Sequence, residues 1–173
     1  MNADTASDQR ATPQVIDGMA ALRERAGSSL GTSRWITMDQ DMVNAFAELS
    51  GDRQWIHVDP DRAKDGPFGT TVAHGFFTLS LSTDLLDDIF SIKGVGTIIN
   101  YGLNRVRFPA PLPVGSRVCM HAAVAEAVEI QGGLQAVYHL EFEIEGQAKP
   151  CCVADLVFRY YGVPEPESPL VAT

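Results

Sequence analysis

The sequence predicts an α+β fold in which a layer of helix is wrapped by one curved antiparallel sheet. Two observations lead to this prediction. Helical spacing dominates the first 90 residues, whereas residues 95–162 are rich in β-branched and aromatic residues without helical spacing. The most apolar helical segment, residues 75–90, comes immediately before these strands, and we expect its apolar face to be buried against the sheet that they form.

The first helix is expected at residues 13–26, where apolar residues recur at helical spacing. A short β-like run follows at residues 33–38. The second helix is expected at residues 39–51, because Asp39 can cap its start and Gly51 can end it.

Residues 52–72 contain prolines and glycines and lack a clean period, so we interpret them as a loop with at most one helical turn. The apolar helix then spans about residues 75–90, and a β segment follows at 95–108. Prolines at alternate positions in 109–116 exclude a central strand there and mark a turn region.

The rest of the chain predicts a meander of long antiparallel strands joined by tight turns. Nothing repeats internally, so we expect a single domain at residues 13–162 between a disordered tail at 1–12 and a flexible tail at 163–173. The three strands and the two turns between them are expected at residues 117–130, 131–133, 134–146, 146–149 and 149–162.

Composition narrows the function classes. The chain has 173 residues, a formal net charge of −9 and a pI near 4.7, which argues against non-specific binding to nucleic acid or anionic membranes. No apolar run is long enough to span a membrane, and the N-terminus lacks the apolar core of a secretory signal. The three cysteines, Cys119, Cys151 and Cys152, are expected to be free thiols in a reducing cytoplasm, and their spacing to the histidines predicts no metal site.

Asp52 and His57 are candidates for acid/base chemistry. An imidazole has an unperturbed pKa near 6.5, and a neighbouring carboxylate couples to its proton affinity. A water held between the two groups could lose one proton while another reaches carbon, which suits hydration of a double bond. Trp55, between them in sequence, would help to exclude bulk water. The plain alternatives are a loop aspartate after a helix end and a buried structural histidine.

A second candidate is the His74-Gly75 pair at the start of the apolar helix. A glycine lets a ligand approach the backbone closely, and the free N–H groups of a helix start can hold a carbonyl oxygen as it becomes enolate-like. The alternatives are a close helix–sheet contact for Gly75 and a structural role for His74.

Other polar residues are candidates for substrate binding. Ser80 and Thr83 offer hydroxyls along the helix, although small polar residues also occur where helices pack. Arg107 points to the same side of its strand as Arg105, where it could meet a phosphate or an acidic surface residue. Asn100 could fasten backbone at the strand end. No nucleophile elbow or phosphate loop is present.

The segments "FAELSGDRQWIHVDPDRAKDGPFGTTVAHGFFTLSLSTDLL" and "INYGLNRVRFPAPLPVGSRV" resemble the core and downstream motifs of MaoC-like dehydratases, the (R)-specific enoyl-CoA hydratases of the hotdog superfamily. The residues of these two segments are most similar to those of the nodulation protein N-like subfamily. The resemblance covers residues 30–162. It implies a hotdog fold, with a long helix wrapped by an antiparallel sheet, and a homodimer whose active sites lie near the subunit interface.

The resemblance also assigns roles. Asp52 and His57 match the catalytic aspartate and histidine that hold the attacking water, and Gly75 matches the glycine whose N–H binds the thioester carbonyl. A serine that some members place beside the pair falls near Thr83. Gln54-Trp55 stand where many relatives carry Asn-Pro. We expect the substrate-binding residues to be Trp55, His74, Phe76, Ser80, Thr83, Asn100 and Arg107.

The implied activity is reversible addition of water to trans-2-enoyl-CoA thioesters, giving (R)-3-hydroxyacyl-CoA. Coenzyme A, or an acyl-carrier protein, would carry the substrate, and no separate cofactor is expected. Two alternatives remain at this point: a hotdog acyl-CoA thioesterase, and a non-catalytic subunit of a heteromeric dehydratase.

Overall fold

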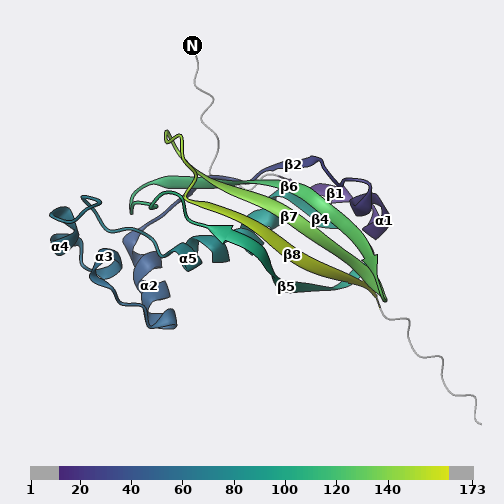
Figure 1. Ribbon diagram of the computed structural model, residues 1–173, viewed down its shortest axis with the longest axis horizontal. Helices are drawn as coiled ribbons and strands as arrows, with labels where there is room; N and C mark the ends of the chain where they lie inside the picture. The colour runs from purple at the N-terminus through teal and green to yellow at the C-terminus, as the bar shows by residue number, and fades with distance from the viewer. Residues whose placement is uncertain (1–11, 164–173) are drawn as a thin grey trace, which may run out of the picture.

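The computed structural model describes residues 12–163 and has the predicted α+β architecture. A curved antiparallel sheet arches over a central helical layer, which is the hotdog arrangement (Figure 1). The tails expected at 1–12 and 163–173 fall, apart from Thr12 and Val163, outside the described residues. In chain order the elements are β1 Gln14–Ile16, α1 Gly18–Arg23, β2 Ser29–Thr32, β3 Ile36–Thr37, α2 Gln40–Ser50, α3 Trp55–Val58, α4 Pro60–Lys64, α5 Gly75–Ser80, α6 Ser82–Ile89, β4 Phe90–Ile92, β5 Val95–Arg107, β6 Arg117–Ile130, β7 Gly133–Ile144 and β8 Cys152–Gly162.

The main sheet has the strand order β2-β6-β7-β8-β5, and β3 also pairs with β6. The β6-β7-β8 meander is confirmed, with antiparallel pairing throughout. β5 lies against β8, so it forms the edge of the sheet opposite β2. An edge strand presents unpaired backbone groups, which can pair with a partner.

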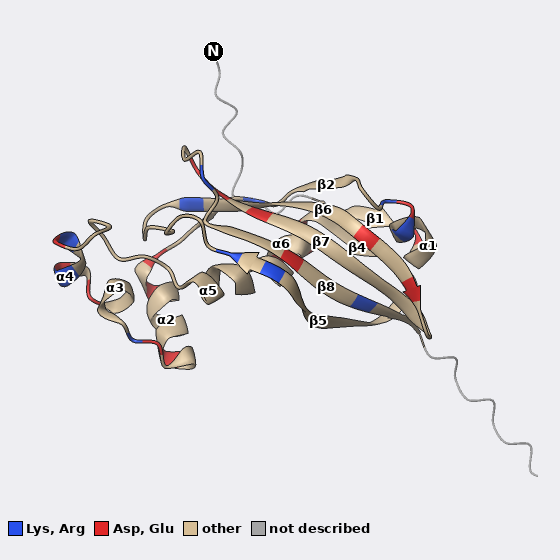
Figure 2. Ribbon diagram, viewed as in Figure 1, with Lys and Arg blue, Asp and Glu red and all other residues tan. Residues whose placement is uncertain are grey.

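The core lies between the concave face of the sheet and the helical layer. Alternate residues of the three central strands point inward, as the two-residue period of a strand requires. α6 contributes apolar residues from one face, and α5 contains no charged residue, whereas charges mark the sheet surface and the outlying helices (Figure 2). The largest fully buried core side chains include Tyr138, Tyr160, Phe142, Met120, Leu85 and Leu156.

The predicted helix at 75–90 is two shorter helices, α5 and α6, which meet at Leu81. Its last predicted residue, Phe90, instead opens β4, which pairs in parallel with β1. Within residues 12–163 no helix is long and apolar enough to cross a membrane.

The predicted helix at 13–26 is wrong in its first part, because Gln14–Ile16 form strand β1. Gln14 also donates a side-chain hydrogen bond to the Leu30 carbonyl at 2.6 Å. Pairing with β4 outweighs the local helical spacing, and only α1 remains helical. The loop expected at 52–72 holds two short helices, α3 and α4, and the β run at 33–38 shortens to β3.

Helix α2 is confirmed together with both of its caps. Asp39 accepts a hydrogen bond from the Met42 N–H at 2.8 Å, and Gly51 ends the helix with a φ of 80°. A φ of this sign favours glycine because a Cβ would clash with the backbone. The end of α2 therefore fixes where the loop containing Asp52 begins.

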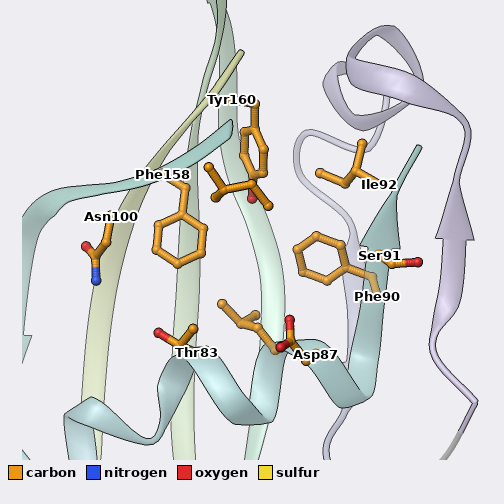
Figure 3. Close-up of a pocket in the computed structure, with 10 residues that line it drawn as sticks. Thr83, Asp87, Phe90, Ser91, Ile92, Asn100, Phe158 and Tyr160 are labelled. Carbon is orange, nitrogen blue, oxygen red and sulfur yellow. The ribbon is translucent and has the colours of Figure 1, made fainter. Parts of the chain in front are cut away.

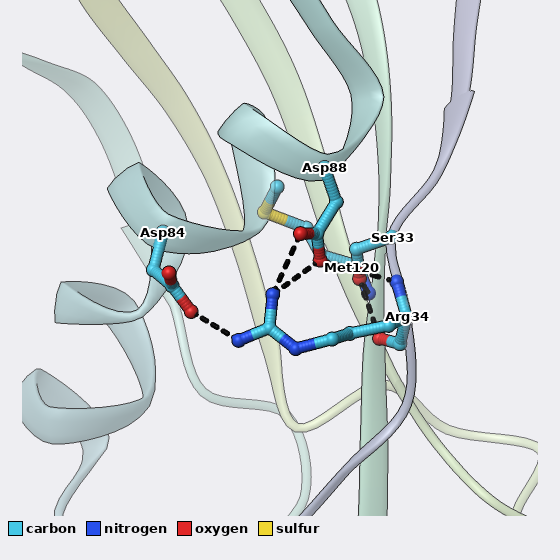
Figure 4. A network of polar contacts seen from close by, with 5 residues as sticks. All are labelled: Ser33, Arg34, Asp84, Asp88 and Met120. Atoms are coloured by element: carbon cyan, nitrogen blue, oxygen red, sulfur yellow. Dashed lines mark hydrogen bonds and ion pairs between the residues drawn. The ribbon is translucent and has the colours of Figure 1, made fainter. Parts of the chain in front are cut away.

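Arg34, between β2 and β3, clamps α6 to the edge of the sheet (Figure 4). Its Nη1 donates to both carboxylate oxygens of Asp88, at 2.7 and 2.6 Å, and its Nη2 pairs with Asp84. The Asp88 side chain is fully buried. The adjacent Ser33 hydroxyl accepts a hydrogen bond from the Met120 N–H at 2.9 Å, which ties the same segment to β6.

Candidate active site

The segment that carries Asp52 and His57 is held from both ends. Gln40, in the first turn of α2, donates its side-chain amide to the His57 carbonyl at 2.7 Å and accepts a hydrogen bond from the Thr71 hydroxyl at 2.5 Å. The Val72 N–H donates to the Ile56 carbonyl at 3.0 Å. These bonds fix α3 against the strand-like segment that leads into α5.

His57 is buried in α3, with 8% of its surface exposed. Its Nδ1 lies 2.7 Å from the Val72 carbonyl oxygen. A carbonyl can only accept, so Nδ1 carries the proton, and in the neutral ring Nε2 is left with a free lone pair. Burial lowers the pKa of His57 and the neighbouring His74 lowers it further, against the opposing effects of the Val72 carbonyl and Asp52. The ring is therefore neutral at neutral pH, as a general base must be.

Asp52 is exposed and lies directly after the αL residue that ends α2. One carboxylate oxygen of Asp52 and one ring nitrogen each of His57 and His74 lie within 4.8 Å of one another. A single water making two hydrogen bonds of about 2.8 Å can bridge such a separation. The structure thus brings together the two residues that the sequence singled out, and adds His74 to them.

His74 is the N-cap residue of α5 and is 3% exposed. Its Nε2–H donates to the Asp52 backbone carbonyl at 2.9 Å, and its ring stacks on His57 with centroids 3.8 Å apart. These contacts place His74 inside the candidate site. Its expected role in substrate binding stays a prediction.

Gly75 is the first residue of α5, so its N–H has no acceptor within its own helix. A Cβ at this position would lie 2.9 Å from the ring of Phe108, too close for two carbon atoms. Gly75 and Phe108 both line a cavity of about 290 Å³. Neither Asp52 nor His57 is among the described residues that line this cavity. Within one chain, Asp52 and His57 are therefore connected to the start of α5 through Ala73 and His74, and they share no cavity with it.

Four of the expected substrate-binding residues line one groove between the helices and β5. Phe76, Ser80, Thr83 and Asn100 surround a cavity of about 330 Å³. Thr83 and Asn100 also line a second cavity of about 340 Å³ (Figure 3). Because they line both, the two cavities adjoin. The far part of this second cavity is mainly apolar, and its lining includes Leu86, Phe90, Ile92, Ile98, Phe158 and Tyr160.

The other two expected residues lie apart from this groove. The Trp55 ring is half-buried and packs against the Arg62 guanidinium, which lies 4.4 Å from the ring centre. Arg107 and Arg105 line a cavity of about 410 Å³ together with Phe108. β5 pairs with β8 in regular register from Arg105 to Arg107, so both arginines lie on one side of β5, as expected. Substrate binding by Trp55 and Arg107 stays a prediction.

Within residues 12–163, two groups of side chains hold donor atoms within 4.8 Å of one another, as a metal site requires: Asp52 with His57 and His74, and Cys119 with His121 and Glu143. In the second group His121 Nε2 and a Glu143 carboxylate oxygen are hydrogen-bonded at 2.7 Å, and burial raises the pKa of the Cys119 thiol to about 12. These contacts account for the second group without a metal. The expected absence of a metal site stays a prediction.

Sequence reasoning missed several residues that shape the site. The Val72 carbonyl fixes the His57 tautomer, and the Gln40 amide holds α3 by its bond to the His57 carbonyl. Neither contact leaves a pattern in the sequence, because each has a backbone carbonyl as its acceptor. Phe108 was also missed, although it follows Arg107 directly in the quoted downstream motif. Its ring lies against Gly75, which is 33 positions earlier in the chain.

Comparison of the sequence with known proteins identifies its family. Residues 22–140 match the MaoC like domain. The chain is 49% identical to 3-hydroxyacyl-thioester dehydratase Z of Mycobacterium tuberculosis (strain H37Rv), over 85% of this chain and 98% of the relative. It is 39% identical to Nodulation protein N of Rhizobium leguminosarum bv. viciae, over 80% and 88% of the two chains. The solved (R)-hydratase from A. caviae involved in PHA biosynthesis superposes with a TM-score of 0.62 at 25% identity, over 74% of this chain and 93% of that one. This chain belongs to the MaoC-like dehydratase family.

Proposed function

We propose that this protein catalyses the reversible hydration of trans-2-enoyl-CoA thioesters to (R)-3-hydroxyacyl-CoA. The observation that carries the proposal is the meeting of the Asp52 carboxylate with the His57 ring, whose Nε2 lone pair is free, close to the start of α5. Membership of the MaoC-like dehydratase family and the 49% identity to 3-hydroxyacyl-thioester dehydratase Z support the same reaction class.

In the proposed mechanism His57 Nε2 takes a proton from water as the water oxygen bonds to C3 of the enoyl group. The electron pair of the double bond moves toward the thioester carbonyl. The Gly75 N–H stabilises the negative charge that develops on the carbonyl oxygen by donating a hydrogen bond to it. The proton that His57 removed passes to the Asp52 carboxylate, which delivers it to C2. C3 thereby gains the hydroxyl group, C2 gains the proton, and both side chains return to their starting states. General acid/base work of this kind contributes about 10²–10⁴-fold and one oxyanion donor about 10²–10³-fold.

The groove lined by Phe76, Ser80, Thr83 and Asn100 would hold the acyl chain, with the apolar cavity beyond it as room for a longer chain. Arg107 would meet a phosphate of the carrier. Its neighbour Arg105 lies on the same side, and within the described chain no carboxylate pairs with either guanidinium. Trp55 would limit the entry of water. Coenzyme A enters as part of the substrate, and no further cofactor takes part.

The protein is proposed to act as a homodimer in the cytoplasm. β5 is an edge strand, and large apolar side chains are exposed on it: Ile98, Ile99, Tyr101 and Leu103 are each between 40% and 56% exposed. Such a patch on an edge strand fits pairing with a second copy. A reducing cytoplasm would keep Cys119, Cys151 and Cys152 as the buried free thiols that the structure contains.

The test is the addition of crotonyl-CoA to the purified protein, followed by the absorbance of the enoyl-thioester band. We expect the band to fall without release of free thiol, and chiral analysis to find the (R)-3-hydroxy product. Release of free thiol would support a thioesterase instead. An unchanged band would contradict the proposal and favour a non-catalytic subunit.

A further inference from the structure

His74 makes two separate contacts with the candidate acid/base pair. Its Nε2–H donates to the backbone carbonyl of Asp52 at 2.9 Å, and its ring lies on the ring of His57 with centroids 3.8 Å apart and planes inclined by 24°. Phe46 of α2 packs against His74 at 5.0 Å between ring centres. One side chain therefore touches both members of the pair, the backbone of Asp52 in the loop after α2 and the ring of His57 in α3.

We infer that His74 is a positioning residue of the acid/base centre, which holds the Asp52 segment in place and keeps a second imidazole against His57. The inference rests on the proposed hydratase function, because it assumes that Asp52 and His57 act together. His74 itself need not touch the substrate.

The positioning follows from where Asp52 lies. Its side chain is exposed, and the bonds of its segment are local: the Asp52 N–H donates to the Ser50 hydroxyl at 3.3 Å, and one carboxylate oxygen accepts from the Gln54 N–H at 3.4 Å. The hydrogen bond from His74 is shorter and spans 22 positions of sequence. It fastens an otherwise locally held loop to the start of α5, beside Gly75, so the carboxylate keeps its distance from both His57 and the helix start.

The stacking has an electrostatic consequence. Two imidazoles at 3.8 Å in a buried site resist simultaneous protonation, because their charges would repel without water between them. The groups that face His57 are the Asp52 carboxylate, the His74 ring and the Val72 carbonyl. Of these, His74 works with burial to lower the pKa of His57, which keeps Nε2 available as a base.

The cost of placing a histidine here supports the inference. With Nε2 committed to Asp52, the Nδ1 atom of His74 is buried and has no hydrogen-bond partner among the described residues. An unsatisfied buried polar atom destabilises the fold and calls for an explanation. The contact of the His74 ring with His57 supplies such an explanation.

Two substitutions separate the two contacts. His74→Gln places an amide N–H where Nε2–H stood, so it keeps the bond to Asp52 but removes the second imidazole. His74→Phe keeps a stacked ring but removes the donor. Phe46→Leu is the matched control, because it alters packing on the same ring without removing either contact, and His139→Gln controls for loss of an exposed histidine.

For His74→Gln we expect an NMR titration to show a higher pKa for His57 than in the wild type, because the repulsive neighbour is gone. The acid limb of kcat/KM for crotonyl-CoA should move to higher pH in step. For His74→Phe we expect kcat at the pH plateau to fall by about 10²-fold, the size associated with a misplaced catalytic group, with KM changed much less. Phe46→Leu and His139→Gln should leave the acid limb where it is.

An unchanged His57 pKa in His74→Gln, together with wild-type plateau kcat in folded His74→Phe, would overturn the inference. Thermal unfolding identifies a variant that fails to fold, and if His74→Phe fails, the titration of His57 in His74→Gln decides alone. The titration needs no activity. A His57 pKa shift in a protein that hydrates no thioester would therefore support the contact with His74 while rejecting the proposed reaction.

Discussion

Replacing Gly75 with alanine tests whether the start of α5 holds the thioester carbonyl. The backbone at Gly75 has no positive φ, so an alanine is not strained there. The added Cβ, however, would lie 2.9 Å from two ring carbons of Phe108. Phe108 is 40% exposed, so its ring can move aside. We expect overpacking of about 1–3 kcal/mol, partly offset by the better helix propensity of alanine, which is worth up to about 1 kcal/mol.

The effect on activity should be much larger than the effect on stability. Displacing the carbonyl from one oxyanion donor costs about 2.7–4 kcal/mol of transition-state stabilisation, or about 10²–10³-fold in kcat. The assay is the fall of the enoyl band with crotonyl-CoA, measured beside thermal unfolding of the same samples. Gly162→Ala is the matched control, because a Cβ there meets nothing within 4 Å.

The double variant Gly75→Ala/Phe108→Ala separates two causes of such a loss. It removes the contact with the ring but keeps the new methyl group beside the Gly75 N–H. We expect it to stay as inactive as Gly75→Ala. Wild-type activity in Gly75→Ala, or full recovery in the double variant, would refute an oxyanion role for Gly75.

Three further predictions follow from other parts of the molecule. Arg34→Met should lower the free energy of unfolding by about 3–5 kcal/mol in urea titration, because it removes the guanidinium that donates to both oxygens of the buried Asp88 carboxylate. A loss below about 1 kcal/mol would show that this ion pair is dispensable for stability. Arg107→Gln should raise KM for crotonyl-CoA by roughly 10-fold, the lower end for a charged hydrogen bond, with kcat unchanged and with no effect on a phosphate-free N-acetylcysteamine thioester. An equal rise for both substrates would contradict a phosphate contact, and Arg23→Gln, in helix α1, is the control. Light scattering of the wild type should give about twice the chain mass of 18.7 kDa, and the Ile98→Lys variant, altered on β5, should be a monomer. A wild-type monomer that is fully active would exclude an active site completed by a second copy.

The parts of the fold that the sequence could predict are those decided locally. Asp39 and Gly51 mark the ends of α2 because their own side chain and backbone make the caps. The alternation in 117–162 likewise predicts the meander, since each strand pairs with its neighbour in the chain. β1 could not be predicted in the same way, because its partner β4 is more than 70 positions away and its three residues also fit a helical pattern.

The same distinction applies to the site. The residue types and spacing of Asp52 and His57 predict that they act together, and the structure places their polar atoms within 4.8 Å along with His74. The stacking of His74 on His57 and the contact of Phe108 with Gly75 depend on how distant segments pack, so no spacing rule reveals them.

The proposed reaction depends most directly on Asp52 and His57 sharing one water, and a single comparison of turnover tests it. Crotonyl-CoA hydration should be measured for the wild type, Asp52→Asn and His57→Gln at equal folded concentration. We predict that each substitution lowers turnover by at least about two orders of magnitude, as loss of a general acid or base does. Turnover near the wild-type rate in both variants would contradict a shared water.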